Sequence, residues 1–344
     1  MVENIKERVQ RIHDKYTIVD AHFDLLMDVE LKRRYGYRKV IETEFLPDFK
    51  KAGVDVIVCS LFIENEFLPE MGLKKALDQI SALYSEIEES PDVIALCTSY
   101  DDIIKAKGEG KLALLLSFEG VDPLTNDLEL LNIFYKLGVR LVGLTWSRRN
   151  FAADGCHFSK KNEGKKGGLT AFGVELVKRA EDMGMILDVS HLNDEGFQDV
   201  VKYTNKPFIA SHSNSRSIHG SMRNLTDDQI KAIADRKGVI GINAIKNIAG
   251  VTDGEAPISK LADHIEYIVN LAGIHHVGYG FDLCNGYYSS ELKFKFAPNN
   301  CDSLSSHAEA VLLTEELLRR GISKEDCKLI IGGNFFRTFN NILV

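Results

Sequence analysis

The fold is decided by a stretch that reads LALLLSFEGVDPLTNDLELLNIFYKLGVRLVGLTW at residues 112–146. It holds two apolar runs, Leu112–Glu119 and Val139–Trp146, with a helical pattern at Leu128–Leu137 between them. Both runs are almost continuously hydrophobic instead of alternating, which is typical of parallel strands buried on both faces. Gly138 lies where the helix should end and the next strand begin. The stretch therefore predicts a β-α-β unit.

The same alternation continues along the whole chain. Six further apolar runs lie at Thr17–Asp24, Val54–Ile63, Met185–His191, Pro207–His212, Gly238–Ala244 and His276–Asp282. Helical patterns lie between the runs, at Thr170–Met183, Asp227–Lys237, Ile258–Ala272 and His307–Arg320. Asn193 and Thr226 stand where helix N-caps are expected. Eight strand-helix repeats without a linker predict an α/β fold, one (β/α)8 TIM barrel domain over residues 1–344, in preference to two doubly wound sheets.

Three segments exceed what a barrel needs. Extra elements are expected at residues 64–100, where a helical pattern, Gly72–Glu89, precedes an additional apolar run, Val93–Cys97. Long polar loops are expected at residues 148–166 and 287–306. Long loops at barrel strand ends often shape the active site.

Composition and charge exclude several classes of protein. Of the 344 residues, 44% are hydrophobic and 27% are charged, which excludes a disordered or collagen-like chain. The 42 Lys and Arg residues against 50 Asp and Glu residues give a net charge of −8, which argues against binding to a nucleic-acid backbone. The charged start of the chain and the lack of an apolar run near ~20 residues predict no signal peptide, no membrane span and a cytoplasmic location. Six scattered cysteines without a CxxC pair predict reduced thiols.

Metal-competent side chains fall at the carboxyl ends of the predicted strands. Six residues lie there: His22 and Asp24 (first run), Glu119 (third), His191 (fifth), His212 (sixth) and Asp282 (eighth). In a TIM barrel these strand ends meet on the face that carries the active site. Because residues two apart along a strand point the same way, His22 and Asp24 are expected to project to one point.

Taken singly, each of these residues has an ordinary explanation, either a histidine hydrogen-bonded in the core or a strand-end carboxylate that caps the next helix. Taken together, three imidazoles and three carboxylates in one apolar barrel mouth need partners or a cation to offset their desolvation. Imidazole and carboxylate donors without thiolate favour zinc, with manganese, iron and cobalt as alternatives. The pattern therefore predicts a metal site.

Several motifs occur together and in order. They are VDAHFD (19–24), LSFEG (116–120), LDVSH (187–191), IASHSNSRSIHGSMRNLTDDQI (209–230), HHVGYGFD (275–282) and GGNFFRTF (332–339). Across almost its whole length the chain resembles the membrane dipeptidase (renal dipeptidase) family of zinc metallopeptidases, in the amidohydrolase class. The resemblance implies a (β/α)8 barrel with two zinc ions per chain, bridged by a glutamate, and a homodimer.

The resemblance also implies a ligand set. His22 and Asp24 would bind one zinc ion, His191 and His212 would bind the other, and Glu119 would bridge both. Such a centre activates a water molecule for amide hydrolysis, so Glu119 counts as a catalytic residue as well as a ligand.

Four further residues are implied to act on the substrate or on its protons. Asp282 matches the family's general acid/base, which passes a proton from the attacking water to the departing amine, with a plain metal ligand as the alternative. Arg223, in the segment SMRN, matches the arginine that grips the free C-terminal carboxylate of a dipeptide, and Asn224 lies beside it; a surface salt bridge is the alternative for Arg223. Trp146 stands where the family usually has a substrate-binding histidine, so the substrate site departs from the family pattern.

The sequence leaves three functions open. The first is a zinc dipeptidase that hydrolyses dipeptides with a free C-terminal carboxylate. Because Trp146 alters the substrate site, the second is a binuclear metal amidohydrolase that acts on N-acyl amino acids or D-residue-containing peptides. The third is a non-catalytic, metal-stabilised binding protein, which the complete ligand set disfavours. An NAD enzyme is disfavoured further, since no glycine fingerprint follows the first strand.

Overall fold

The computed structural model describes residues 4–158, 162, 164–252, 254–284, 287 and 301–343. Its centre is a parallel sheet with the strand order β6-β5-β4-β2-β1-β8-β7, and β3 pairs with β4 off this path. The strands are β1 (Ile18–Phe23), β2 (Val54–Phe62), β3 (Ile94–Leu96), β4 (Leu112–Glu119), β5 (Val139–Gly143), β6 (Ile186–Asp188), β7 (Ile240–Ile242) and β8 (Val277–Tyr279).

The two ends of this sheet meet at the sixth predicted run, Pro207–His212. Parallel bridges join Asp188 of β6 to Ile209, and Ala210 to Ile240 of β7. The run therefore completes the ring through two bridges instead of a regular strand. The fold is a (β/α)8 TIM barrel, as the sequence predicts, and strand β3 is the additional apolar run that was expected at residues 93–97.

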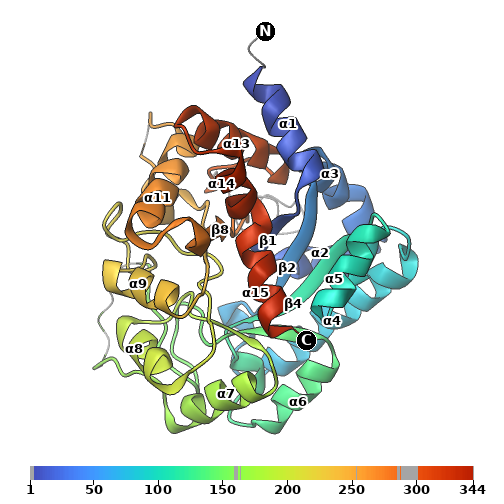
Figure 1. Ribbon diagram of the computed structural model, residues 1–344. Helices are drawn as coiled ribbons and strands as arrows, with labels where there is room; N and C mark the ends of the chain where they lie inside the picture. The colour runs from blue at the N-terminus through green and yellow to red at the C-terminus, as the bar shows by residue number, and fades with distance from the viewer. Residues whose placement is uncertain are drawn as a thin grey trace.

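Helices surround the strands on the outside of the ring (Figure 1). The α-helices are α1 (Ile5–Lys15), α2 (Leu25–Arg34), α3 (Leu46–Ala52), α4 (Gly72–Glu89), α5 (Tyr100–Gly108), α6 (Glu129–Lys136), α7 (Ala171–Asp182), α8 (Asp194–Tyr203), α9 (Asp227–Asp235), α10 (Lys246–Ala249), α11 (Pro257–Ala272), α13 (Ala310–Arg319), α14 (Lys324–Lys328) and α15 (Asn334–Ile342). Short 3-10 or π turns are η1 (Ile41–Phe45), η2 (Asn65–Phe67), η3 (Asp122–Leu124), η4 (Ile274–His276), η5 (His307–Glu309) and η6 (Leu329–Gly333).

Local sequence signals explain where several helices begin and end. The side chains of Asn193 and Thr226 accept hydrogen bonds from the backbone N–H groups of the first turns of α8 and α9, as N-caps do. Gly138, just after α6, has a φ of 102°, a conformation that glycine adopts without strain. Helix α4 occupies Gly72–Glu89, the predicted range. The predicted loops 148–166 and 287–306 lie partly outside the described residues.

Helix α15 lies across the end of the barrel that faces the viewer in Figure 1. It buries Phe335 and Phe339 in one cluster with Val19 of β1 and Val56 of β2. The Asn334 amide donates hydrogen bonds of 2.8 Å to the carbonyl oxygens of Ile274 and Val277, which tie the start of the helix to β8. The C-terminal motif GGNFFRTF therefore closes this end of the barrel.

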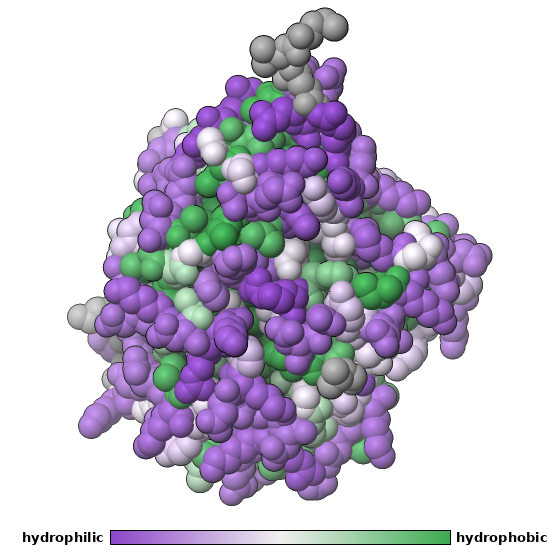
Figure 2. All heavy atoms as spheres, in the orientation of Figure 1, coloured by the Kyte–Doolittle hydropathy of each residue, from purple (hydrophilic) through white to green (hydrophobic). Residues whose placement is uncertain are grey.

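The hydropathy of one face of the molecule and of its helices can be described. Figure 2 shows a mostly hydrophilic face, on which the hydrophobic areas are small and separate. None of the described helices combines the length and the apolar character that crossing a bilayer requires.

A buried histidine makes the fold sensitive to acid. His264 of α11 is fully buried; its Nδ1 accepts a hydrogen bond of 3.2 Å from the Ser215 N–H, and its Nε2 donates one of 2.9 Å to the Ala249 carbonyl oxygen. Burial lowers the pKa of His264 to about 4. Since the unfolded chain takes up the proton near pH 6.5 and the folded chain near pH 4, we expect stability to fall as the pH drops through this window, by up to about 3 kcal/mol.

Denaturant unfolding at a series of pH values checks this expectation. The free energy of unfolding should fall more steeply between pH 6.5 and pH 4 for the wild type than for His264→Asn. Carboxylates and bound metal affect both proteins equally, so identical slopes would show that His264 does not cause the acid sensitivity.

Candidate metal centre

Six side chains converge at the carboxyl ends of the barrel strands. His22 Nε2 lies 3.7 Å from Asp24 Oδ1, 3.6 Å from Glu119 Oε2 and 3.8 Å from Asp282 Oδ1. Glu119 Oε1 lies 2.9 Å from His191 Nε2 and 3.7 Å from His212 Nε2. The six residues that the sequence places at strand ends are therefore brought together, with Glu119 in the middle. We call them the central cluster.

The orientation of His212 is fixed by a chain of hydrogen bonds. Asp188 accepts the hydroxyl hydrogen of Ser211, and the same Ser211 oxygen lies 2.7 Å from His212 Nδ1. Because that hydroxyl hydrogen is already used, His212 Nδ1 must carry a hydrogen and donate it. Nε2 then keeps its lone pair and points it toward Glu119, which is the tautomer a metal ligand needs.

Two further residues of the cluster, His191 and Asp282, are also held from behind. His191 Nδ1 lies 2.9 Å from the Ser147 hydroxyl, and the Asn243 amide donates to Asp282 Oδ2 at 2.8 Å. His191 and Asp282 have φ angles of 69° and 59°, in the left-handed region that non-glycine residues seldom occupy. Backbone strain of this kind gathers at functional sites, where the surrounding structure holds a side chain in a required position.

Burial disfavours the charged forms of the side chains in the cluster. Burial raises the pKa values of Asp24 and Glu119 to about 7, and it raises that of Asp282 well above its ordinary value. Burial lowers the pKa values of His191 and His212 well below 6.5, with a further contribution from the Arg223 charge. A divalent cation would favour the ionised carboxylates and the neutral imidazoles together.

Unpartnered atoms support a metal at this place. In the described part of the chain, the buried atoms His22 Nε2, His191 Nε2, His212 Nε2 and Glu119 Oε2 have no hydrogen-bond partner. Buried polar atoms are normally paired, and leaving several unpaired at one point is costly. Two donor triplets, His22 with Asp24 and Glu119, and Glu119 with His191 and His212, each lie close enough to hold one ion. The residues present therefore fit a binuclear metal centre.

A cavity of about 330 Å³ opens beside the central cluster. Asp24, Glu119, His191 and Asp282 form its polar wall, and the remaining lining residues are Phe62, Trp146, Phe158, Ile245, Ile248, Cys284 and Cys301. The ring centroids of Trp146 and His191 are 5.9 Å apart. The residue that departs from the family pattern thus lies directly on the cavity wall.

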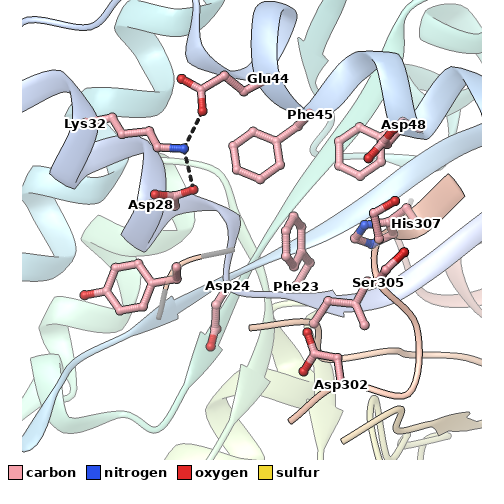
Figure 3. A pocket seen from close by; sticks show the side chains of 14 residues that line it. Phe23, Asp24, Asp28, Lys32, Glu44, Phe45, Asp48, Asp302, Ser305 and His307 are labelled. Atoms are coloured by element: carbon pink, nitrogen blue, oxygen red, sulfur yellow. Dashed lines mark hydrogen bonds and ion pairs between the residues drawn. The ribbon is translucent and has the colours of Figure 1, made fainter. Parts of the chain in front are cut away.

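A second pocket, of about 280 Å³, adjoins the cluster at Asp24 (Figure 3). In the view, Lys32 lies between Asp28 and Glu44 and forms an ion pair with each. Phe45 stands between these charges and the rest of the pocket. The charges at this end of the pocket are therefore paired with one another.

Arg223 and Asn224 lie close behind the cluster. Arg223 is buried, and its Nη2 donates to the His212 carbonyl oxygen at 3.1 Å, while its Nε has no hydrogen-bond partner. The Asn224 amide donates to the carbonyl oxygens of His219 and Ile248 at 2.9 and 2.8 Å. Neither residue is among those that line the 330 Å³ cavity. Asn224 shapes its loop in this structure, and the substrate contacts of both residues stay predictions.

The barrel and its buried donor set define the class of the protein, a metal-dependent hydrolase. The chain belongs to the membrane dipeptidase family (peptidase family M19), whose family model matches residues 6–343. It is thus a member of a metallo dipeptidase family over nearly its whole length.

Two curated relatives illustrate the sequence similarity. A protein described as uncharacterized, from the pqqA 5' region of Klebsiella pneumoniae, is 34% identical over 209 residues, which cover 60% of this chain and 77% of that protein. Dipeptidase aclJ from Aspergillus oryzae is 28% identical over 305 residues, which cover 86% of this chain and 69% of that protein.

Solved structures share the fold. A metallopeptidase from Rhodobacter sphaeroides, liganded with a phosphinate mimic of the dipeptide L-Ala-D-Ala, has a TM-score of 0.82 and 21% identity, covering 96% of this chain and 99% of that one. The probable dipeptidase PvdM from Pseudomonas aeruginosa has a TM-score of 0.80 and 20% identity, covering 98% of each chain.

Proposed function

We propose that this protein is a zinc-dependent dipeptidase that hydrolyses the amide bond of dipeptides with a free C-terminal carboxylate. The position of Glu119 is the observation that carries the proposal. Its Oε2 faces His22 at 3.6 Å, and its Oε1 faces His191 at 2.9 Å and His212 at 3.7 Å. Glu119 thus directs one oxygen to one histidine and the other oxygen to two histidines. A carboxylate in this arrangement is suited to bridging two cations.

The chain offers a complete set of donors for two zinc ions. His22 and Asp24 would hold one ion, His191 and His212 the other, and Glu119 both. When bound, such a pair of ions lowers the pKa of a shared water toward neutrality and polarises the scissile carbonyl group.

Asp282 moves the proton in the proposed reaction. Its Oδ2 is occupied by the Asn243 amide, while its Oδ1 faces His22 across 3.8 Å on the cavity side. Oδ1 takes the proton of the attacking water and delivers it to the departing amine. The left-handed backbone at Asp282 holds the carboxylate in this direction.

Residues outside the cluster determine how the substrate lies. Arg223 carries a buried positive charge behind His212 and has an unpaired Nε, and we assign this guanidinium group to the substrate carboxylate. Trp146, Phe62 and Phe158 give the cavity an apolar wall that packs against a substrate side chain and excludes water. L,D dipeptides belong among the candidate substrates, because the Rhodobacter sphaeroides relative was solved with a mimic of L-Ala-D-Ala.

The aromatic wall also favours a second candidate function. The Trp146 ring packs in tilted contacts with those of Phe62 and Phe158, whose centroids are 5.1 and 5.7 Å away. Such a surface accommodates an acyl chain as readily as an amino-acid side chain. The second candidate is therefore a binuclear metal amidohydrolase that acts on N-acyl amino acids or D-residue-containing peptides.

Amidation of the substrate tests the carboxylate requirement. We expect a dipeptide amide to show a kcat/KM roughly 10–150-fold below that of the free dipeptide, because it loses a charge-assisted hydrogen bond of about 1.5–3 kcal/mol to Arg223. The matched variant is Arg223→Gln. In this variant the ratio of kcat/KM for the free dipeptide to kcat/KM for its amide should fall toward one. Equal rates for both substrates in the wild type would remove the carboxylate requirement and the role assigned to Arg223.

Cytoplasmic location and a homodimer stay predictions for this chain. Cell fractionation tests the first, and light scattering of the purified protein tests the second.

A further inference from the structure

Three groups at the edge of the cavity form a second donor cluster, separate from the central cluster. Cys284 Sγ lies 3.2 Å from Cys301 Sγ, and Asp302 Oδ1 lies 3.5 Å from the first sulfur and 3.4 Å from the second. Neither cysteine is part of a disulfide. Their positions in the sequence, 17 residues apart and without a CxxC spacing, give no sign of this meeting.

The backbone holds the three groups in place from two strand ends. Cys284 follows β8, and its N–H donates to Asp302 Oδ2 at 2.9 Å. Cys301 and Asp302 lie against the segment that follows β7: the Lys246 N–H donates to the Cys301 carbonyl oxygen at 2.7 Å, and Ile245 forms an antiparallel bridge with Asp302. The cluster therefore joins the exits of two neighbouring strands.

Asp302 is the buried carboxylate of this cluster. It is only 4% exposed, and it directs one carboxylate oxygen to the Cys284 N–H and the other to both sulfurs. Figure 3 shows Asp302 on the loop that also carries Ser305 and His307. Two sulfurs and one carboxylate oxygen therefore lie close enough together to hold one metal ion.

The distances between the two sulfurs and the Asp302 oxygen agree with tetrahedral coordination of one ion. Zinc bonds of about 2.3 Å to sulfur and about 2.0–2.2 Å to oxygen place a sulfur and an oxygen about 3.5 Å apart and two sulfurs about 3.8 Å apart. Both sulfur–oxygen distances already match, and the two sulfurs need to separate by about half an ångström.

We propose that Cys284, Cys301 and Asp302 bind one thiolate-preferring divalent cation, such as zinc or cobalt. Binding releases two thiol protons, and two thiolates and one carboxylate then hold the ion, with the fourth position open to water. The ion fixes the chain two residues after Asp282, on the wall of the cavity. This site does not depend on the proposed catalytic function, because it shares no ligand with the central cluster.

Cobalt titration of the reduced protein under anaerobic conditions tests this site. Thiolate bound to cobalt absorbs in the near ultraviolet by charge transfer, and the central cluster offers no thiolate, so the absorption reports on Cys284 and Cys301. We expect the band in the wild type, and we expect both Cys284→Ala and Cys301→Ala to lose the band and one metal ion per chain. The control is Cys97→Ala. It removes a buried thiol that lies beside β3 and does not line the cavity, so this variant should keep both the absorption band and the metal ion.

Three outcomes would overturn the proposal: no band in the reduced wild type, a band that survives in both cavity variants, or a band that Cys97→Ala also removes. If the reduced wild type gives no band but mild peroxide joins Cys284 to Cys301, with a mass loss of two hydrogens, the pair is a redox pair and the metal assignment is wrong. A protein that shows the cysteine-dependent band but hydrolyses no dipeptide would contradict the proposed function and leave this site intact.

Discussion

Asp282→Asn is expected to lower kcat/KM for a dipeptide by about 10²–10⁴-fold while the metal content stays at the wild-type level. Asparagine keeps the size of the side chain and accepts the hydrogen bond from Asn243, but it cannot take up a proton. Steady-state kinetics and elemental analysis of the same sample check the two parts of this prediction.

The matched control is Asp235→Asn, the same chemical change on the exposed end of α9, which should leave turnover unchanged. A fall in metal content together with activity would make Asp282 a metal ligand instead of a proton carrier. If a wild type that cleaves dipeptides lost no activity on this substitution, the proton-transfer role would be wrong.

Glu119→Gln is expected to lower both the metal content and the turnover. Glu119 is the residue that faces all three histidines of the central cluster, so its loss removes the link between the two proposed ions. We expect the metal content to fall by at least one ion per chain and kcat/KM to fall by about 10³-fold or more, the equivalent of several kcal/mol of lost Lewis-acid assistance.

Glu129→Gln, on the helix α6 that follows the same strand, provides the comparison for Glu119. It makes the same change at a residue outside the central cluster, so both metal content and activity should be retained. Full metal content in Glu119→Gln would contradict the bridging role.

Most of the fold is predictable because buried parallel strands leave a strong hydrophobic signal. The runs at Leu112–Glu119 and Val54–Ile63 correspond to β4 and β2 within one residue. The sixth run, Pro207–His212, shows the limit of this signal. Its residues are as apolar as the others, but it pairs through only two bridges, because the ring has to close between β6 and β7.

The central cluster is equally predictable, because the ends of parallel strands meet at one face whatever lies between them. The contacts that support the cluster, in contrast, are not predictable from the sequence. Ser211 is recognisable as a partner of His212 only when the hydroxyl is seen between that imidazole and Asp188. The left-handed backbone at His191 has no signal in the sequence, since non-glycine residues seldom adopt it.

Contacts between distant loops are also invisible in the sequence. Cys284 and Cys301 meet because the exits of β7 and β8 are neighbours in the ring, which their spacing does not show. The hydrogen bonds of the Asn224 amide to the carbonyl oxygens of His219 and Ile248 are likewise seen only in the structure, and its substrate contact stays a prediction.

The decisive measurement is amine release from L,L and L,D dipeptides, with zinc-loaded and chelator-stripped protein side by side. We expect hydrolysis that disappears when the metal is stripped and returns when zinc is added, with two ions at the central cluster. Hydrolysis that continues without metal, or no hydrolysis of any dipeptide by a protein confirmed to hold both ions, would contradict it.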